Sequence, residues 1–183
     1  MTGVQTCALP IYCRRARQAC KSQRTQPASL DVSTGRRYGV KGYGYMASHQ
    51  IDPTHSEPLT TFLKHVNTVI TLHGYGRKGY FTSILLGGRH RALASHLADH
   101  LRTALPAYDI CDDLSRIPSD LAGQHANNPV NLVPSTGVQI ELPPRVRGQS
   151  PLWWDWDSDD VSPHTSKLID ALIAGIDSWV SGR

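Results

Sequence analysis

The sequence lacks any long hydrophobic run. Its longest apolar stretches, such as residues 69–72 and 83–86, are far shorter than the about 20 residues of a membrane-spanning helix. It also lacks a disulfide framework, because only 4 cysteines are spread over 183 residues. Hydrophobic residues make up 39% and charged residues 19%, which excludes collagen-like and largely disordered classes. The length suits one globular domain.

Most of the chain has little excess charge of either sign. The formal net charge is +4 and the pI is about 9.0. However, residues 1–40 hold seven basic residues and one acidic residue, whereas the remainder holds twelve basic and fourteen acidic residues. A nucleic-acid-binding protein with a basic arm is therefore a hypothesis about the first 40 residues alone. For the rest we expect neither a nucleic-acid nor a membrane partner.

Residues 1–40 show few features of a folded domain. They have no sustained apolar periodicity, and their charges follow the apolar residues 7–12 instead of preceding them as in a secretory signal. The spacing of Cys7, Cys13 and Cys20 matches no zinc-site pattern. The string TGVQTCALPI (residues 2–11) resembles the translation of a sequencing adapter. We predict that residues 1–40 are an artefact or a disordered basic segment, with a genuine basic arm as the alternative, and that the domain spans residues 41–183.

From residue 41 onward the pattern alternates between strands and helices. Apolar, β-branched runs predict strands over residues 67–73, 80–86, 108–111 and 137–142. Leucines at four-residue spacing predict a helix over 89–105, ended by Pro106, and Ser162 with Pro163 predicts the start of a last helix. Residues 115–133 read as a polar loop with a helical turn. The fold class is α/β, a single domain whose mixed or largely parallel sheet is flanked by helices on both faces.

Two predicted strands end in residues that can do chemistry. His73 closes the first strand, and a neutral imidazole there suits a zinc ligand; a hydrogen-bonded histidine near a turn is the alternative. Glu141 lies within GVQIEL, where a carboxylate is costly to bury unless it reacts or pairs. It could be a general base or a structural partner of a nearby arginine. Ligands gather at the carboxyl ends of strands in such sheets, so we expect His73 and Glu141 to share a site.

Two other pairs have the spacing of metal ligands. His96 and His100 lie four residues apart on one predicted helix, but without an HExxH glutamate we interpret them as solvent-facing histidines. His49 and Asp52 could meet one metal ion from a proline-bounded loop, which makes them weaker candidates for ligands.

Two segments together resemble the phage-type poly-γ-glutamate hydrolase family, which is similar to a compact zinc carboxypeptidase. They are TLHGYGRKGYFTSILLGG (residues 71–88) and AGQHANNPVNLVPSTGVQIELPPRVRG (residues 122–148). The resemblance covers about residues 45–150. It implies a carboxypeptidase-like fold, zinc as cofactor, His73 as a zinc ligand and Glu141 as the base that activates water. It also implies substrate contacts, for which the candidates are Arg89, Asn128, Asn131, Arg145 and Arg147.

The sequence departs from this family in one respect. The family takes its first two zinc ligands from an HxxE motif, and no HxxE occurs in this chain. The resemblance therefore implies a zinc-dependent amide hydrolase whose metal site is incomplete here. The alternative is a non-catalytic or truncated binding domain of the same fold.

The expected substrate is an anionic peptide or a γ-glutamyl polymer. Residues 41–183 have a net charge of −2, so attraction of a polyanion must be local. The single cysteine of that part, Cys111, fits a reducing compartment, and we expect a soluble protein of the cytoplasm in preference to a secreted one.

Overall fold

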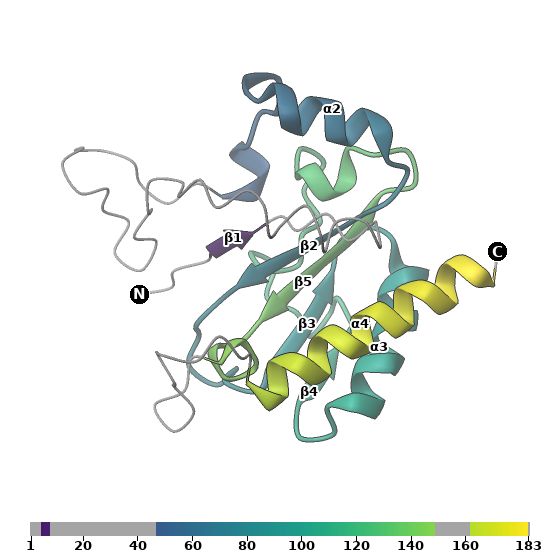
Figure 1. Cartoon of the computed structure of the whole chain (residues 1–183). Helices are drawn as coiled ribbons and strands as arrows, with labels where there is room; N and C mark the ends of the chain where they lie inside the picture. Colours follow the sequence, from purple (N-terminus) through teal and green to yellow (C-terminus); the bar gives the residue numbers. More distant parts are fainter. Residues whose placement is uncertain (1–4, 8–46, 149–161, 183) are drawn as a thin grey trace.

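The chain folds around one mixed sheet (Figure 1). The computed structural model describes residues 5–7, 47–148 and 162–182. The strands are β1 (Gln5–Cys7), β2 (Val69–Gly74), β3 (Ser83–Gly87), β4 (Asp109–Cys111) and β5 (Gly137–Leu142), in the order β1-β2-β5-β3-β4. The β2–β5 and β3–β4 pairs are parallel, and the β1–β2 and β3–β5 pairs are antiparallel. The prediction of a mixed α/β sheet is confirmed.

Two helices pack on the same face of this sheet. They are α3 (Arg91–Ala104) and α4 (Pro163–Ser181), which lie side by side in Figure 1. Because side chains alternate along a strand, one set of strand residues faces these helices and forms the main core with them. On β5 and β3 this set is Val138, Ile140, Leu142, Ile84 and Leu86. The helices contribute Leu93, Leu97, Leu101, Leu168 and Leu172 to the same core.

His96 and His100 belong to the contact between α3 and α4. The Nε2 atoms of both rings lie within hydrogen-bond distance of Ser178 Oγ on α4, at 2.8 and 3.2 Å, and that of His96 is also 3.0 Å from the Gly175 carbonyl oxygen. Both histidines are half-buried, so the prediction that they face solvent is met only in part. They join two helices whose close approach depends on Gly175, where a Cβ would lie 2.9 Å from a Leu97 methyl carbon.

Helix α4 begins as its sequence predicts. Ser162 is the N-cap, its Oγ accepts a hydrogen bond from the Thr165 backbone N–H at 3.3 Å, and Pro163 occupies the first turn. This bond satisfies one of the backbone donors that a helix start leaves without a partner.

We expect Ser162→Ala to lower the free energy of unfolding by about 1 kcal/mol, because the capping acceptor is lost. Urea denaturation followed by circular dichroism measures the change. Ser181→Ala, at the other end of the same helix, is the control and should change stability by less than about 0.5 kcal/mol. Equal effects of the two substitutions would contradict a capping role for Ser162.

The opposite face of the sheet is covered in large part by chain without regular helix. Residues 112–125, which we call the cover loop, follow β4 and pack Ile117, Leu121 and Ala122 against Tyr75 and Leu85. Of the described helices, α3 and α4 lie on the first face, whereas α2 (Glu57–His65) packs Leu63 against Val69 of β2, whose side chain points to the opposite face. The expectation of helices on both faces is therefore met, with α2 at the start of β2. This open face is the one on which a ligand can reach the sheet.

A further helix, α2 (Glu57–His65), was not predicted from the sequence. It packs Leu63 against Val69, Val130 and Val133 near the start of β2. Its N-terminal pattern was visible, because Ser56 caps it and Pro58 lies in its first turn. This pattern was overlooked because the prolines of residues 49–58 were interpreted as the bounds of a loop.

Residues 1–40 lie largely outside the described part of the chain. Gln5–Cys7 is the exception, and it pairs with β2 opposite Gly74, His73 and Leu72. Among the described helices, none combines the length and the apolar character that crossing a membrane requires.

Candidate active site

A polar stripe runs along the open face of β2 and β5. Thr71 and His73 on β2 lie opposite Gln139 and Glu141 on β5, and all four are buried. They alternate with apolar neighbours that face α3 and α4, so the strand period alone directs these side chains to the open face. His73 is 2% exposed and Glu141 1%. The expectation that these two residues share a site agrees with this arrangement.

Hydrogen bonds fix the orientation of Glu141. The Asn128 Oδ1 accepts from the Val130 backbone N–H, so its Nδ2 donates to Gln139 Oε1 at 2.7 Å. Gln139 Nε2 in turn donates to Glu141 Oε1 at 2.8 Å. The chain of donors and acceptors thus ends on a carboxylate oxygen that accepts.

The two oxygens of Glu141 have different surroundings. Oε1 receives the Gln139 bond and lies 3.3 Å from His73 Nδ1. Oε2 is buried and has no hydrogen-bond partner among the described residues. A buried oxygen without a partner is costly unless another group occupies that position during function. The hydrogen-bonding capacity of Oε2 is therefore not used by the described residues.

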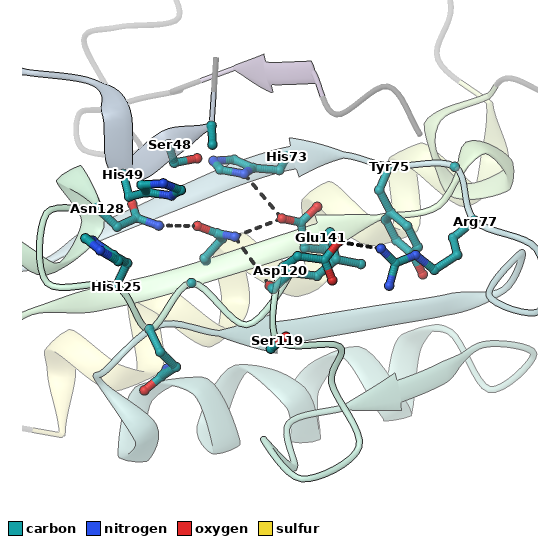
Figure 2. Close-up of a pocket in the computed structure, with 16 residues that line it drawn as sticks. Ser48, His49, His73, Tyr75, Arg77, Ser119, Asp120, His125, Asn128 and Glu141 are labelled. Atoms are coloured by element: carbon teal, nitrogen blue, oxygen red, sulfur yellow. Dashed lines mark hydrogen bonds and ion pairs between the residues drawn. The ribbon is translucent and has the colours of Figure 1, made fainter. Parts of the chain in front are cut away.

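The pair lies in the wall of a cavity of about 330 Å³. Figure 2 shows His49, His125 and Asn128 on one side of Glu141 and Tyr75 and Arg77 on the other. Residues from β2, β5, the cover loop and the segment before η1 (Ser48–Gln50) complete the lining. They include Gly76, Ser119, Asp120, Leu121, Gly123, Gln124 and Gln139.

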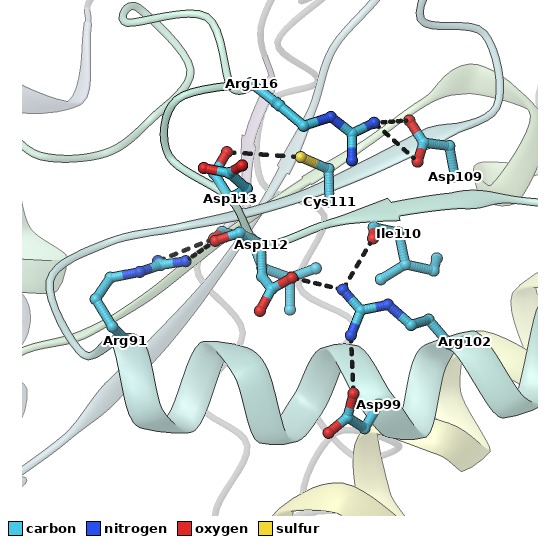
Figure 3. Close-up of polar contacts among 10 residues, drawn as sticks. Arg91, Asp99, Arg102, Asp109, Ile110, Cys111, Asp112, Asp113 and Arg116 are labelled. Carbon is cyan, nitrogen blue, oxygen red and sulfur yellow. Dashed lines mark hydrogen bonds and ion pairs between the residues drawn. The ribbon is translucent and has the colours of Figure 1, made fainter.

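Buried polar contacts hold the cover loop over the sheet. Asn131 Nδ2 donates to the carbonyl oxygens of Gly123 and His125 at 2.7 and 3.0 Å. Gly87 approaches the Ala122 carbonyl so closely that a Cβ there would lie 2.2 Å from the oxygen. Figure 3 shows Arg91 and Arg102 reaching from α3 toward Asp112, where the loop begins. The wall of the cavity is thus fixed at both of its ends.

Tyr75 supports the floor of the cavity beside Glu141. Its side chain is 1% exposed, and its hydroxyl donates to the Ser83 carbonyl oxygen at 2.6 Å. Burial, with a contribution from the Glu141 carboxylate, raises the pKa of Tyr75. The phenol therefore stays protonated at neutral pH.

The predicted substrate-binding arginines do not line the cavity. Arg145 stacks on the Tyr108 ring at 5.5 Å, among residues of the face that α3 and α4 cover. Arg147 donates to the Tyr75 carbonyl oxygen at 3.3 Å, and burial lowers the pKa of its guanidinium. Arg89 is exposed and donates to the Gln124 carbonyl oxygen at 3.1 Å. None of the three lines the cavity, although Arg147 and Arg89 bond to the backbone of two residues that do, Tyr75 and Gln124.

The two predicted asparagines have different positions. Asn128 is 4% exposed and lines the cavity, where it begins the hydrogen-bond chain to Glu141. Asn131 does not line the cavity and holds the cover loop instead.

The weaker pair, His49 and Asp52, does not converge. His49 lines the cavity, and its ring centroid lies 4.6 Å from that of His125. Asp52 is exposed and caps a short 3-10 turn, where hydrogen bonds from Thr54 lower its pKa. Its carboxylate therefore stabilises this turn by accepting hydrogen bonds from Thr54.

Sequence reasoning missed most of the cavity lining, including four side chains that matter to its chemistry. His125 and Asp120 come from the cover loop, Arg77 follows β2, and Gln139 lies two residues before Glu141. Gln139 could have been found, because the period of two puts it on the face of Glu141. The loop residues carry no such periodic pattern.

Whether these residues could hold a zinc ion depends on the types of their side chains and on the distances between them. Three histidines and a glutamate line one cavity, and imidazole and carboxylate are suitable zinc donors. However, within residues 47–148 and 162–182, no three His, Cys, Asp or Glu side chains lie close enough together to hold a metal ion. The described residues by themselves do not fit a three-ligand zinc site.

The family model for poly-gamma-glutamate hydrolase matches residues 40–167 of the sequence. This chain belongs to the poly-gamma-glutamate hydrolase family. The matched range includes every described residue that lines the cavity, with His73 and Glu141 among them. It confirms the family resemblance found in the two sequence segments. A comparison with curated proteins found no match.

Solved structures with the same fold include a bacteriophage poly-gamma-glutamate hydrolase and the zinc-free apo form of YNDL. The bacteriophage structure has a TM-score of 0.57 at 17% identity, over 73% of this chain and 64% of the other. The YNDL structure has a TM-score of 0.60 at 16% identity, over 96% of this chain and 89% of the other. This chain therefore spans less than two thirds of the bacteriophage chain. At these identities the likeness establishes the fold of the family.

Proposed function

We propose that this chain hydrolyses γ-glutamyl amide bonds of an anionic polymer or peptide, with Glu141 as the general base. One observation carries the proposal. The buried Glu141 carboxylate lies in the wall of a cavity, with one oxygen held by Gln139 and His73 and the other without a partner among the described residues. A carboxylate fixed in this way is oriented to take a proton from water. Family membership supports amide hydrolysis as the reaction.

Hydrolysis needs two proton transfers at the same place. Glu141 Oε2 would accept a proton from the attacking water and then donate it to the nitrogen of the leaving amine. Gln139 keeps Oε1 occupied throughout, so that Oε2 is the oxygen available to react. Asn128 acts on the reaction indirectly, because it fixes the orientation of the Gln139 amide.

Zinc is the cofactor that the family resemblance implies, and the zinc-free form of YNDL is consistent with zinc binding in that protein. Here His73 is the one described residue for which the resemblance implies a ligand role. We propose that the chain holds zinc weakly, because the HxxE motif is absent and the described donors do not converge.

We expect a dissociation constant for Zn²⁺ above about 1 μM, since closed sites with a full set of protein ligands bind far more tightly. Isothermal titration calorimetry of the chelator-treated chain measures it. Hydrolysis should then appear only when zinc is added in excess and should disappear on dialysis. Stoichiometric zinc bound with submicromolar affinity would show that the chain supplies a complete ligand set.

The proposed reaction is tested with poly-γ-glutamate as substrate. The full chain is incubated with the polymer and excess zinc, and polymer length is followed by size-exclusion chromatography. We expect shorter products and new free amino groups. Poly-α-glutamate is the control polymer, with the same charge per residue and a different linkage. No shortening of poly-γ-glutamate at any zinc concentration would contradict the proposed hydrolysis.

A second candidate function is binding without catalysis. It is favoured because the described His, Asp and Glu side chains do not come together as metal ligands. A cavity without a complete metal site can still bind a γ-glutamyl chain, as a non-catalytic member of the family. Equilibrium binding of the polymer without any shortening would support this function over hydrolysis.

A further inference from the structure

The cavity contains one strongly basic side chain. Among the described lining residues, Arg77 is the only lysine or arginine, whereas Asp120 and Glu141 are acidic. A γ-linked glutamate polymer carries one free α-carboxylate on each residue, because the side-chain carboxyl forms the amide. A site for such a polymer needs a cation placed beside the reacting bond.

Arg77 lines the same cavity as Glu141 but is already paired. Its Nη2 donates to Asp120 Oδ2, an interaction between the segment that follows β2 and the cover loop. Figure 2 shows this pair near Glu141, on the side opposite His49 and His125. The Arg77 side chain is 28% exposed and that of Asp120 63%, so water reaches both groups. An ion pair of this exposure is held only weakly and can exchange partners.

The other candidate cations cannot take this position without giving up their contacts. Arg89 and Arg147 donate to backbone oxygens of the lining residues Gln124 and Tyr75, and Arg145 lies over the Tyr108 ring. Among the described lysines and arginines, Arg77 is the one whose own side chain belongs to a residue of the cavity lining.

We propose that Arg77 binds the α-carboxylate of a γ-glutamyl residue in the cavity, and that Asp120 is an internal anion which the substrate must displace. This inference rests on the proposed function and adds the residue that selects the substrate. Arginine presents two parallel donors that match a carboxylate, so the ligand gains a bidentate pair in place of the single contact with Asp120. Asp120 discriminates against neutral ligands, which offer Arg77 nothing in exchange.

The proposal makes opposite predictions for the two members of the pair. Arg77→Gln should weaken binding of a γ-linked glutamate oligomer by roughly tenfold or more, because a charge-assisted contact is lost. Asp120→Asn should strengthen binding by roughly twofold to fivefold, because Arg77 no longer has a competing partner. A structural salt bridge would instead give similar losses with both variants.

A matched control pair lies elsewhere on the molecule. Arg116 pairs with Asp109 at 3.3 Å, both side chains are more than half exposed, and neither lines the cavity (Figure 3). Arg116→Gln and Asp109→Asn change the net charge as the test variants do. Both should leave the affinity for the oligomer within about twofold, which separates local from overall electrostatic effects.

The experiment uses the full chain with a chelator present, so that binding is measured without turnover. Isothermal titration calorimetry gives the affinity of a γ-linked glutamate oligomer for the wild type and the four variants, and circular dichroism checks the fold of each. A KM measured with excess zinc is the second readout, and it should rise in Arg77→Gln and fall in Asp120→Asn.

The outcomes separate this inference from the proposed function. If the wild type binds or hydrolyses the oligomer and Arg77→Gln does so equally well, the role of Arg77 is wrong and the proposed function stands. A loss of affinity in Asp120→Asn would also overturn the competing role of Asp120. If the wild type neither binds nor hydrolyses the oligomer, both proposals fall.

Discussion

Replacement of Glu141 by glutamine is expected to lower the rate of poly-γ-glutamate hydrolysis by about 10²- to 10⁴-fold, the usual contribution of a positioned general base. Glutamine keeps the shape of the side chain but has no carboxylate to accept a proton. The measurement is the rate of polymer shortening with excess zinc. It isolates proton transfer because the substitution leaves the size of the cavity nearly unchanged.

The fold should tolerate this substitution. Gln139 Nε2 donates to Glu141 Oε1, and the carbonyl oxygen of a glutamine can accept the same bond. We expect the free energy of unfolding to change by less than about 1 kcal/mol. Glu57→Gln is the matched control, because Glu57 is exposed on α2 and should leave the rate unchanged. Equal turnover of Glu141→Gln and the wild type would remove Glu141 as the base.

The largest expected loss of stability comes from Gly87→Ala. Gly87 ends β3 on the open face, and a Cβ there would lie 2.2 Å from the Ala122 carbonyl oxygen. That oxygen also accepts a hydrogen bond from the Gly88 backbone N–H at 2.9 Å, so the cover loop cannot move away without breaking it. We expect the free energy of unfolding to fall by at least about 3 kcal/mol, as measured by urea denaturation.

Gly76→Ala provides the control for this result. Gly76 follows β2, and a Cβ at that position would meet no atom within 4 Å. Its substitution should change the free energy of unfolding by no more than about 0.5 kcal/mol. A Gly87→Ala variant as stable as Gly76→Ala would show that the loop is not held against the sheet at this point.

The central strands and their polar stripe could be predicted from the sequence. GVQIEL forms β5 with the predicted bounds, and its alternation directs Ile140 to one face and Glu141 to the other. Helix α3 could be predicted for the same reason, since its leucine period follows directly from helix geometry, and the start of α4 could be predicted from Ser162 and Pro163. Strands and helices can be recognised in a sequence because positions one period apart face the same environment, apolar core or polar surface.

The cavity wall could not be predicted in this way. His125 and Asp120 lie in the polar segment 115–133, whose position over the sheet depends on contacts with distant residues, such as Gly87 with Ala122. Arg77 gains its importance from Asp120, 43 residues away in the chain. Arg145 and Arg147 do not line the cavity, because proximity to Glu141 in sequence does not determine on which side of the sheet a side chain lies. Arg145, four residues after Glu141, packs on Tyr108 among residues of the helix-covered face.

The position of β5 has a consequence for how the molecule is assembled. β5 follows β2, β3 and β4 in the chain, yet it lies between β2 and β3 in the sheet. Until residues 137–142 are in place, β2 and β3 each present an unpaired edge, which is a template for association with other chains. The same residues bring Glu141 beside His73. The strand that supplies the proposed base is thus also the one that closes the sheet, so a folding intermediate without β5 is at once inactive and prone to aggregation.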